Sequence, residues 1–376
     1  MCRLTRWRRC LVARKVTPDA SLISDESYTA TDSGGLVYPF EGKAPARGEV
    51  LRVAPSLRWA RITMPGSLGH INSWLLDDHD GHVAVVDCGL RVPDCADDWK
   101  KLFKHGLKGE HISRVFGTHM HPDHIGLAGW LTKKNGIDIW MTRGEMLTAR
   151  MMVAENENAL PEEMLIAQRR AGWDEAAIEA QRAQGWGRMM RVMYPLPKGY
   201  HRIMDGDVLD FGKASWRVVV GSGHSPEHAC LWDETNGVLV SGDQVLPRIS
   251  SNVSVNISEP YADPLGEWLA SIDKLLAVLP GDLLVCPAHG DPFKGLHHRL
   301  EALRDEHHAR LDRVEAFIRK EPARVVDCFG LIFNRKIEGE QASLATGEAL
   351  AHLRWLERNG RARCDEVDGV YWFSGA

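Results

Sequence analysis

Short apolar runs recur along the chain, and each of them ends in polar residues that can bind a metal or carry a proton. The runs are four or five residues long, which is typical of buried strands, and ligand-type side chains follow directly after them. Because strands fix the positions of the loops that follow them, we expect these side chains to gather along one rim of a sheet. The runs that predict core strands are 83–86, 114–117, 216–220, 237–240 and 283–286.

Helical patterns separate several of the predicted strands, for example around residues 94–105 and 263–279. Strands that alternate with helices are typical of layered proteins in which helices cover the faces of a sheet. We therefore predict the α/β class, with layered sheets and outer helices.

Residues 141–204 differ in composition from the rest of the chain. They contain nine of the twelve methionines, together with Trp173 and Trp186, and residues that favour helices fill the positions between them. The pattern predicts a helical, Met-rich insertion. Either it packs on the core as an ordinary amphipathic hairpin, or it forms an apolar lid or substrate wall, for which flexible and polarisable methionine is well suited.

The last part of the chain predicts a small separate domain. Aliphatic residues recur at helical spacing from Leu296 to Ile318, and a second amphipathic helix is expected near 343–358. The dipeptide Asp368-Gly369 then lies between two β-type segments, which is typical of a hairpin turn. Helices followed by a hairpin favour a winged-helix-like C-terminal domain over residues 296–376.

Composition narrows the class of protein. The chain has 376 residues, 44% hydrophobic and 26% charged, and its net charge of −5 gives no sign of a surface that binds polyanions. Its eight cysteines form no C-x-x-C pair, and no apolar stretch reaches about 18 residues, so we expect a cytoplasmic protein without a membrane span. Residues 1–45 are basic at their start and predict a poorly ordered leader, followed by the main domain over 46–295.

The strongest chemical signal directly follows the predicted strand at 114–117. His119, His121, Asp123 and His124 lie within six residues of one another. His119 and His121 have the spacing to bind one metal ion, and Asp123 and His124 lie one turn further on, where they can bind a second. Imidazole and carboxylate are suitable ligands for zinc and also for iron or manganese. A surface histidine cluster would not require the aspartate.

These residues form an H-x-H-x-D-H motif, and the chain here resembles the metallo-β-lactamase superfamily over roughly residues 50–295. The remaining motifs of that family follow in the right order, each at the end of a predicted strand, at Asp87, His224, Asp243 and His289. The resemblance implies an αββα sandwich. Its closest branches are those of glyoxalase II, the lactonases, and the β-lactamase-like thioesterases and endoribonucleases that end in a winged helix.

The resemblance also implies a role for each motif residue. His119, His121 and His224 would hold one divalent ion, and Asp123, His124 and His289 would hold a second, with Asp243 between the two. Asp87 would order the site rather than bind metal. His228 is expected to hydrogen-bond or pack beside the ligands. Zinc is the expected metal, with iron or manganese as alternatives.

Two metal ions in such a site predict a hydrolase that attacks its substrate with a metal-bridged hydroxide, with Asp123 orienting the nucleophile. We expect a small-molecule acyl substrate with a thioester, lactone or ester bond, because the Met-rich insertion favours an apolar ligand. A nuclease or phosphodiesterase is the first alternative, although the C-terminal part carries no net basic charge and nucleic acid is therefore disfavoured. A metal-binding sensor without turnover is the second, and a homodimer is left open.

One further segment is expected to adjoin the metals. Residues 244–256 directly follow Asp243 and contain Arg248 and Asn252. We predict that Arg248 or Asn252 contacts a carboxylate, phosphate or carbonyl group of the substrate. The alternative is that these residues only order the loop.

Overall fold

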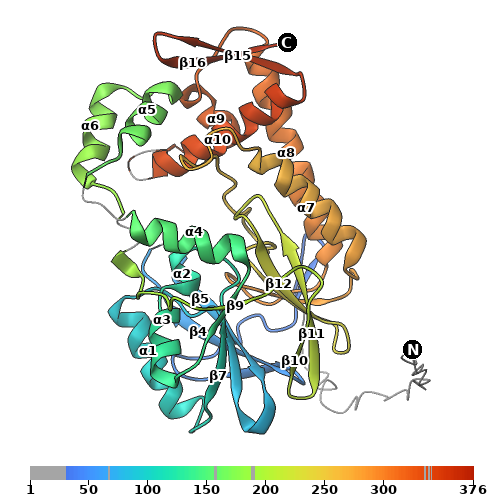
Figure 1. Ribbon diagram of the computed structural model, residues 1–376. Coiled ribbons are helices and arrows are strands. Elements are labelled where there is room, and N and C mark those ends of the chain that lie inside the picture. Colours follow the sequence, from blue (N-terminus) through green and yellow to red (C-terminus); the bar gives the residue numbers. More distant parts are fainter. Residues whose placement is uncertain are drawn as a thin grey trace, which may run out of the picture.

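Two β-sheets pack face to face at the centre of the molecule, and helices cover both outer faces (Figure 1). The computed structural model describes residues 31–66, 68–155, 159–187, 191–333, 336–337, 339 and 341–376. Within them, the larger sheet contains, in spatial order, β3 (Leu51–Ala54), β4 (Leu57–Thr63), β5 (His70–Asp77), β6 (Val83–Val86), β7 (Ile112–Phe116), β8 (Ile139–Met141) and β9 (His201–Arg202). The smaller sheet contains β10 (Val208–Phe211), β11 (Ala214–Gly221), β12 (His228–Asp233), β13 (Val238–Gly242) and β14 (Leu284–Pro287).

Apolar side chains form three packed layers, and strand β6 contributes to two of them. Val83 and Val85 point to the outer face of the larger sheet, whereas Ala84 and Val86 point to the layer between the sheets. A strand that is buried on both faces needs a continuous apolar sequence, which is the pattern that predicted it. The helices that cover the sheets and build the C-terminal part are α1 (Pro93–His105), α2 (Pro122–Ile125), α3 (Ala128–Asn135), α4 (Arg143–Ala154), α5 (Glu162–Ala171), α6 (Glu175–Gln184), α7 (Pro264–Val278), α8 (Leu296–Ile318), α9 (Phe329–Ile332) and α10 (Gln341–Arg358).

The strand directions bring the ends of five strands, β6, β7, β11, β13 and β14, to one rim. Strands β6 and β7 are parallel, with Val86 opposite Phe116, and β13 and β14 are parallel, with Gly242 opposite Pro287. Strand β11 runs in the same direction as β13, because both are antiparallel to β12. The two sheets are joined at this rim by a hydrogen bond of 2.8 Å from the backbone N–H of Ala229 to the carbonyl of Thr118.

The insertion differs from its prediction. Residues 141–204 were expected to be helical throughout, but their ends belong to strands β8 and β9. Helix α4 packs on the larger sheet through Met146 and Ala149, whereas α5 and α6 lie beside the C-terminal helices (Figure 1). Met189 and Met190, which were part of the Met-rich pattern, lie outside the described residues.

Helix α5 is tied to the C-terminal part by specific contacts. The indole N–H of Trp173, just beyond α5, donates a hydrogen bond of 2.9 Å to the hydroxyl of Thr346 on α10. The guanidinium of Arg170 lies 5.3 Å from the ring centre of Tyr371. The insertion therefore packs on two parts of the molecule: α4 contacts the larger sheet, and α5 contacts the C-terminal part.

The C-terminal part contains the predicted helices and hairpin. Helix α8 begins at Leu296 and ends at Ile318, and α10 is followed by β15 (Ala362–Val367) and β16 (Val370–Gly375). The turn between these strands has positive φ at Asp368 (51°) and Gly369 (77°), as a type I′ hairpin turn requires. The hairpin is confirmed, and the winged-helix-like assignment stays a prediction.

The leader was predicted too long. Residues 31–45 were expected to be poorly ordered, but β1 (Thr31–Ser33) pairs with β2 (Leu36–Tyr38), and Leu36 and Tyr38 are buried. Val37 exchanges backbone hydrogen bonds with Lys294, so this segment closes on the chain just before α8. Residues 1–30 lie outside the described residues. None of the described helices combines the length and the apolar character needed to cross a bilayer.

Candidate metal centre

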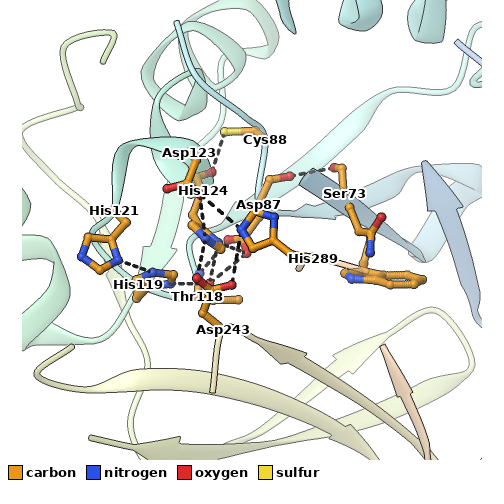
Figure 2. Close-up of polar contacts among 12 residues, drawn as sticks. Ser73, Asp87, Cys88, Thr118, His119, His121, Asp123, His124, Asp243 and His289 are labelled. Carbon is orange, nitrogen blue, oxygen red and sulfur yellow. Dashed lines mark hydrogen bonds and ion pairs between the residues drawn. The ribbon is translucent and has the colours of Figure 1, made fainter. Parts of the chain in front are cut away.

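The loop after β7 delivers the histidine-rich motif to the rim. Pro122 occupies the first turn of α2, a position that suits proline because the backbone N–H there needs no partner inside the helix. The short helix then turns Asp123 and His124 towards the side on which His119 and His121 lie (Figure 2). His119 and His124 are completely buried.

Three imidazoles converge on one point. The distance from Nε2 of His119 to Nδ1 of His121 is 2.8 Å, and Nε2 of His224 lies 3.1 Å from His121 Nδ1 and 3.2 Å from His119 Nε2. His224 reaches this point from the loop that follows β11. The fold therefore brings together the three predicted residues, although His224 lies more than 100 positions away from the other two in the chain.

A second group lies beside the first, and Asp243 lies between the two. Nε2 of His124 lies 3.6 Å from a carboxylate oxygen of Asp123, and Nε2 of His289 lies 3.3 Å from the same oxygen. The carboxylate of Asp243 is 3.4 Å from His124, 3.6 Å from His224 and 3.6 Å from His289. The sets of residues that could each hold one ion are His119, His121 and His224; Asp123, His124 and His289; and His119, His124 and Asp243.

Four of the five imidazoles are held from behind through Nδ1. Each of these Nδ1 atoms faces an oxygen of the protein, which leaves Nε2 directed at the centre. The hydroxyl of Thr118 already donates to Asp87 at 2.8 Å, so it can accept from His119. The pairs are His119 with the Thr118 hydroxyl at 3.0 Å, His124 with the Asp87 carboxylate at 2.7 Å, His224 with the Asn252 carbonyl at 2.7 Å, and His289 with the His70 carbonyl at 3.0 Å.

The imidazoles of the first group are neutral. Burial lowers the pKa of His119 well below its usual value, lowers the pKa of His121 to about 3, and also lowers the pKa of His224. Neutral imidazole is the form that binds a metal ion, so these three residues need lose no proton to act as ligands.

The second group is electrostatically different, because carboxylates surround its imidazoles. Burial alone would lower the pKa of His124, but Asp87, Asp123 and Asp243 outweigh it and hold that pKa well above its usual value. Burial alone would raise the pKa of Asp123, but His124 and His289 outweigh it and lower that pKa to about 2. Asp123 is therefore ionised, and it favours positive charge at the point that it faces.

Two residues predicted to support the site are placed to do so. Asp87 accepts hydrogen bonds from the backbone N–H of Thr118 at 2.9 Å, from its hydroxyl, and from His124. His228 accepts a hydrogen bond of 3.0 Å from the backbone N–H of Asp243 and stacks on His119, so its Nε2 is engaged away from the centre.

Arg248 and Asn252 have contacts other than those predicted. The side chain of Arg248 is exposed, and its guanidinium lies 5.6 Å from the ring centre of Tyr38. The side-chain amide of Asn252 donates to Glu348 at 2.9 Å, and its oxygen accepts from the Ser254 hydroxyl at 2.5 Å. For Asn252 the loop-ordering alternative fits these contacts, whereas a substrate contact of Arg248 stays a prediction.

One buried carboxylate that joins two ligand loops was missed at the level of sequence, where no motif marks it. Glu145 on α4 accepts hydrogen bonds from the backbone N–H of Met120, the hydroxyl of Ser225 and the backbone N–H of Glu227, at 2.8, 2.7 and 2.7 Å. It therefore fastens the loop of His119 and His121 to the loop of His224. Burial raises the pKa of Glu145 to about 7.

Comparisons with known proteins agree with this geometry. The metallo-beta-lactamase superfamily model matches residues 66–289, and the model of the metallo-beta-lactamase-like C-terminal domain matches residues 311–376. A beta-lactamase domain protein from Burkholderia ambifaria has a solved structure that is 39% identical, with a TM-score of 0.83 over 91% of this chain and 98% of that one. A metallo-beta-lactamase family protein from Thermus thermophilus is 25% identical, with a TM-score of 0.71 over 86% of this chain and all of that one.

A curated relative extends the comparison to a protein described as an enzyme. The probable metallo-hydrolase YqjP of Bacillus subtilis (strain 168) is 22% identical over 319 residues, which cover 83% of this chain and 93% of that protein. The family model spans more than half of the chain and includes all seven residues that converge at the rim. The chain therefore belongs to the metallo-beta-lactamase superfamily and is a metal-dependent hydrolase with an appended metallo-beta-lactamase-like C-terminal domain.

Proposed function

We propose that the protein holds two divalent cations, most favourably zinc, and hydrolyses a carboxylic ester-type bond: a thioester, a lactone or an ester. The observation that carries the proposal is the way the imidazoles are held. Four histidines engage an oxygen of the protein through Nδ1 and present Nε2 to a shared centre. Histidines that bind metals are typically oriented by such hydrogen bonds.

The residues fit a pair of cations in spacing and in chemistry. Nitrogen ligands in a tetrahedral zinc site lie about 3.3 Å apart, given zinc–nitrogen distances of about 2.0–2.1 Å. The three nitrogens of His119, His121 and His224 lie 2.8 to 3.2 Å apart. In the second group Nε2 of His124, Nε2 of His289 and one oxygen of Asp243 are buried and have no hydrogen-bond partner among the described residues. Buried polar atoms rarely remain unpartnered, and a bound cation would satisfy all three.

The proposed assignment gives each group of ligands one cation. His119, His121 and His224 would hold the first, and Asp123, His124 and His289 the second, with Asp243 shared between them. The chemistry that such cations supply is Lewis acidity, which polarises a carbonyl oxygen and lets water ionise near neutral pH.

The two carboxylates Asp123 and Asp243 have different roles in the proposed reaction. Asp123 is ionised, because its pKa is about 2, and its side chain is 19% exposed, compared with 11% for Asp243. It can therefore accept a hydrogen bond from the attacking water and orient it. Asp243, buried between the two groups, has its pKa held well below the usual range by His124 and His289 against the effect of burial, and it stays in place as a ligand.

An acyl substrate is favoured over a phosphodiester by the state of the C-terminal arginines. Arg354, Arg358, Arg361 and Arg363 are the C-terminal arginines that could form a basic stripe for nucleic acid, and other groups of the protein engage the first three of them. Arg354 pairs with Glu357, Arg358 donates to the carbonyl of Tyr261, and Arg361 pairs with Asp312 and Glu315. Guanidinium groups engaged in this way offer little to phosphates, on which nucleic-acid binding depends.

Apolar side chains in the loops beside the centre support the same substrate class. Leu68 is 41% exposed and lies two residues before His70, whose carbonyl faces His289. Ile249 is 49% exposed and lies between Asp243 and Asn252 in the chain. Exposed leucine and isoleucine in these loops would suit an apolar acyl group.

A panel of substrates tests the proposal. We expect the purified protein to turn over chromogenic thioesters, lactones or esters, and we expect a chelator or Asp243→Ala to abolish that turnover. Elemental analysis should give about two zinc, iron or manganese ions per chain. Turnover of bis-phosphodiesters alone would instead identify a nuclease, and bound metal without turnover would identify a sensor. Absence of stoichiometric metal would refute the metal centre.

A further inference from the structure

A series of hydrogen bonds links the C-terminal domain to the metal centre. Nδ1 of His224 lies 2.7 Å from the backbone carbonyl of Asn252. A carbonyl oxygen only accepts hydrogen bonds, so Nδ1 must carry the proton and Nε2 must be the atom that is available to bind metal. The position of the Asn252 backbone therefore determines both the tautomer and the direction of this ligand.

Asn252 in turn is held by a residue of helix α10. Its side-chain amide donates a hydrogen bond of 2.9 Å to Oε2 of Glu348. Glu348 is only 6% exposed, and its other oxygen accepts a hydrogen bond of 3.3 Å from Arg310 on α8. Both helices belong to the C-terminal part of the chain, whereas His224 and Asn252 belong to the part that matches the superfamily model.

Helix α10 also touches the same loop with its backbone. The N–H of Val255 donates to the carbonyl of Gly347 at 3.1 Å. A Cβ atom at Gly347 would lie 2.7 Å from Cβ of Ser254, which is closer than side chains approach one another. Glycine at this position is what allows the helix and the loop to approach so closely.

A second series of hydrogen bonds anchors the start of the loop that contains Asn252. The hydroxyl of Ser250 lies 3.2 Å from Nε2 of His307 on α8, and Nδ1 of His307 lies 3.3 Å from Nε2 of His352 on α10. His352 ends the chain by donating from Nδ1 to the backbone carbonyl of Glu348 at 2.8 Å. The loop between Ser250 and Val255 is thus fastened to α8 and α10 through Ser250, Asn252, Ser254 and Val255.

We infer that Glu348 is a positioning residue of the metal centre, which acts through Asn252 to fix the orientation of His224. The inference rests on the proposed function, because it requires His224 to be a metal ligand. It assigns the C-terminal domain a defined part in the centre, although none of the C-terminal residues that the structure describes belongs to the converging groups. The hydrogen bond from Asn252 needs an acceptor at position 348, which glutamine retains and alanine lacks.

Cobalt(II) binding tests the inference without relying on turnover. Metal-free protein is titrated with Co²⁺, and the affinity (by competition with a chelator) and the visible ligand-field spectrum are recorded. Removing a residue that orients a ligand typically weakens metal binding by about 10–100-fold. We expect Glu348→Ala to weaken the binding of one of two Co²⁺ ions by about 10-fold or more and to change its spectrum, and Glu348→Gln to restore most of both.

Two further variants separate positioning from general destabilisation. Glu357→Ala removes a carboxylate of the same helix that pairs with Arg354, and it should leave cobalt binding unchanged. Asn252→Ala retains the carbonyl that faces His224 but loses the bond to Glu348. It should therefore reproduce the effect of Glu348→Ala, and the double variant should be no weaker than either single one. If Glu348→Ala fails to fold, Asn252→Ala and Glu348→Gln carry the test.

These measurements can reject the positioning role of Glu348 separately from the proposed metal centre. If wild-type protein binds two Co²⁺ ions and both Asn252→Ala and Glu348→Ala match it in affinity and spectrum, Glu348 does not position the centre. The same conclusion follows if Glu357→Ala has an equal effect. If His224→Ala binds as many cobalt ions as tightly as wild type, His224 is not a ligand and the proposed centre itself is wrong.

Discussion

Nδ1 of His124 lies 2.7 Å from Oδ2 of Asp87, and both side chains are buried. Asp87 has a left-handed backbone conformation, with φ of 58°, which is uncommon for a residue other than glycine. The strained position at the end of β6 allows one carboxylate to face both His124 and Thr118. Backbone strain of this kind persists where the surrounding contacts require it.

The first prediction concerns Asp87. Asp87→Ala removes the acceptor for Nδ1 of His124 and leaves the backbone N–H and hydroxyl of Thr118 without this acceptor. We expect metal affinity to fall by about 10–100-fold. We also expect the free energy of unfolding of the metal-free protein to fall by about 1–3 kcal/mol for the buried groups left unpaired. Elemental analysis and urea unfolding measure the two effects.

A matched substitution separates charge from shape at the same position. Asp87→Asn keeps the size of the side chain and one acceptor oxygen, so it should cost less stability than alanine. Its amide has one acceptor oxygen where Asp87 uses two, so either the backbone N–H of Thr118 or His124 and the Thr118 hydroxyl must face the NH₂ group. Metal affinity should therefore still fall. Equal affinity in wild type and both variants would show that His124 needs no support from Asp87.

Much of this centre could be predicted from the sequence, because its ligands directly follow apolar strands. Strand β6 was placed correctly, the other four predicted strands lie within a residue or two of their predicted bounds, and α8 begins and ends as its apolar spacing indicated. The seven expected ligands converge because parallel neighbours such as β6 and β7 end at the same rim. Local pattern and strand direction together are enough to determine this part of the structure.

What could not be predicted depends on packing between segments that are distant in the chain. Glu145 and Glu348 lie within helices whose sequences give no hint that one carboxylate will be buried against a ligand loop. Leu36 and Tyr38 are buried where β2 closes against Lys294, far away in the chain, and the local sequence of this short segment predicted it to be poorly ordered. Helix α5 faces the C-terminal domain for a similar reason, through Trp173 and Thr346.

The second prediction concerns the pH dependence that Glu145 adds to stability. Burial raises its pKa from an ordinary value of 4.5 to about 7 in the folded protein. The folded state therefore holds this proton more tightly than the unfolded state, so its contribution to stability is fully present below about pH 4.5 and is lost as pH rises through about 7. With about 1.4 kcal/mol per pKa unit, the change is on the order of 3 kcal/mol.

Glu145→Gln isolates this effect, because glutamine cannot titrate. The free energy of unfolding of metal-free wild type, minus that of the variant, should decrease between pH 4.5 and 7. The variant itself should be less stable at pH 4.5, since its NH₂ group must face one of the donors that the carboxylate accepts from. A difference that stays constant with pH would mean that Glu145 is ionised throughout this range.

The third prediction uses the close approach of α10 to the loop after Asp243. Gly347→Ala places a methyl group 2.7 Å from Cβ of Ser254 and 3.1 Å from the carbonyl oxygen of Val255, so the loop or the helix must move. We expect a loss of about 1–3 kcal/mol in the free energy of unfolding, as is usual for overpacking. Cobalt affinity should weaken as well, because the same loop carries the carbonyl that faces His224.

Gly330→Ala is the matched control for that change. Gly330 lies in helix α9, and a Cβ atom there would meet no described atom within 4 Å. Alanine is a better helix former than glycine by up to about 1 kcal/mol, so stability should stay the same or rise slightly. If both glycine variants lose stability equally, the contact with Ser254 is not the cause.

The last prediction concerns removal of the metal. Without cations, the ionised carboxylates of Asp123 and Asp243 lie beside each other and close to His124 and His289, whose pKa values they raise. A ligand at 100 times its dissociation constant stabilises a folded protein by about 2.7 kcal/mol, so a chelator should lower the melting temperature by several degrees. Scanning calorimetry at pH 7, with zinc and with chelator, measures the shift. The double variant Asp123→Ala/Asp243→Ala keeps only the three imidazoles of the first group, so it should show a clearly smaller shift. A shift of wild-type size in that variant would show that these carboxylates do not hold the stabilising metal.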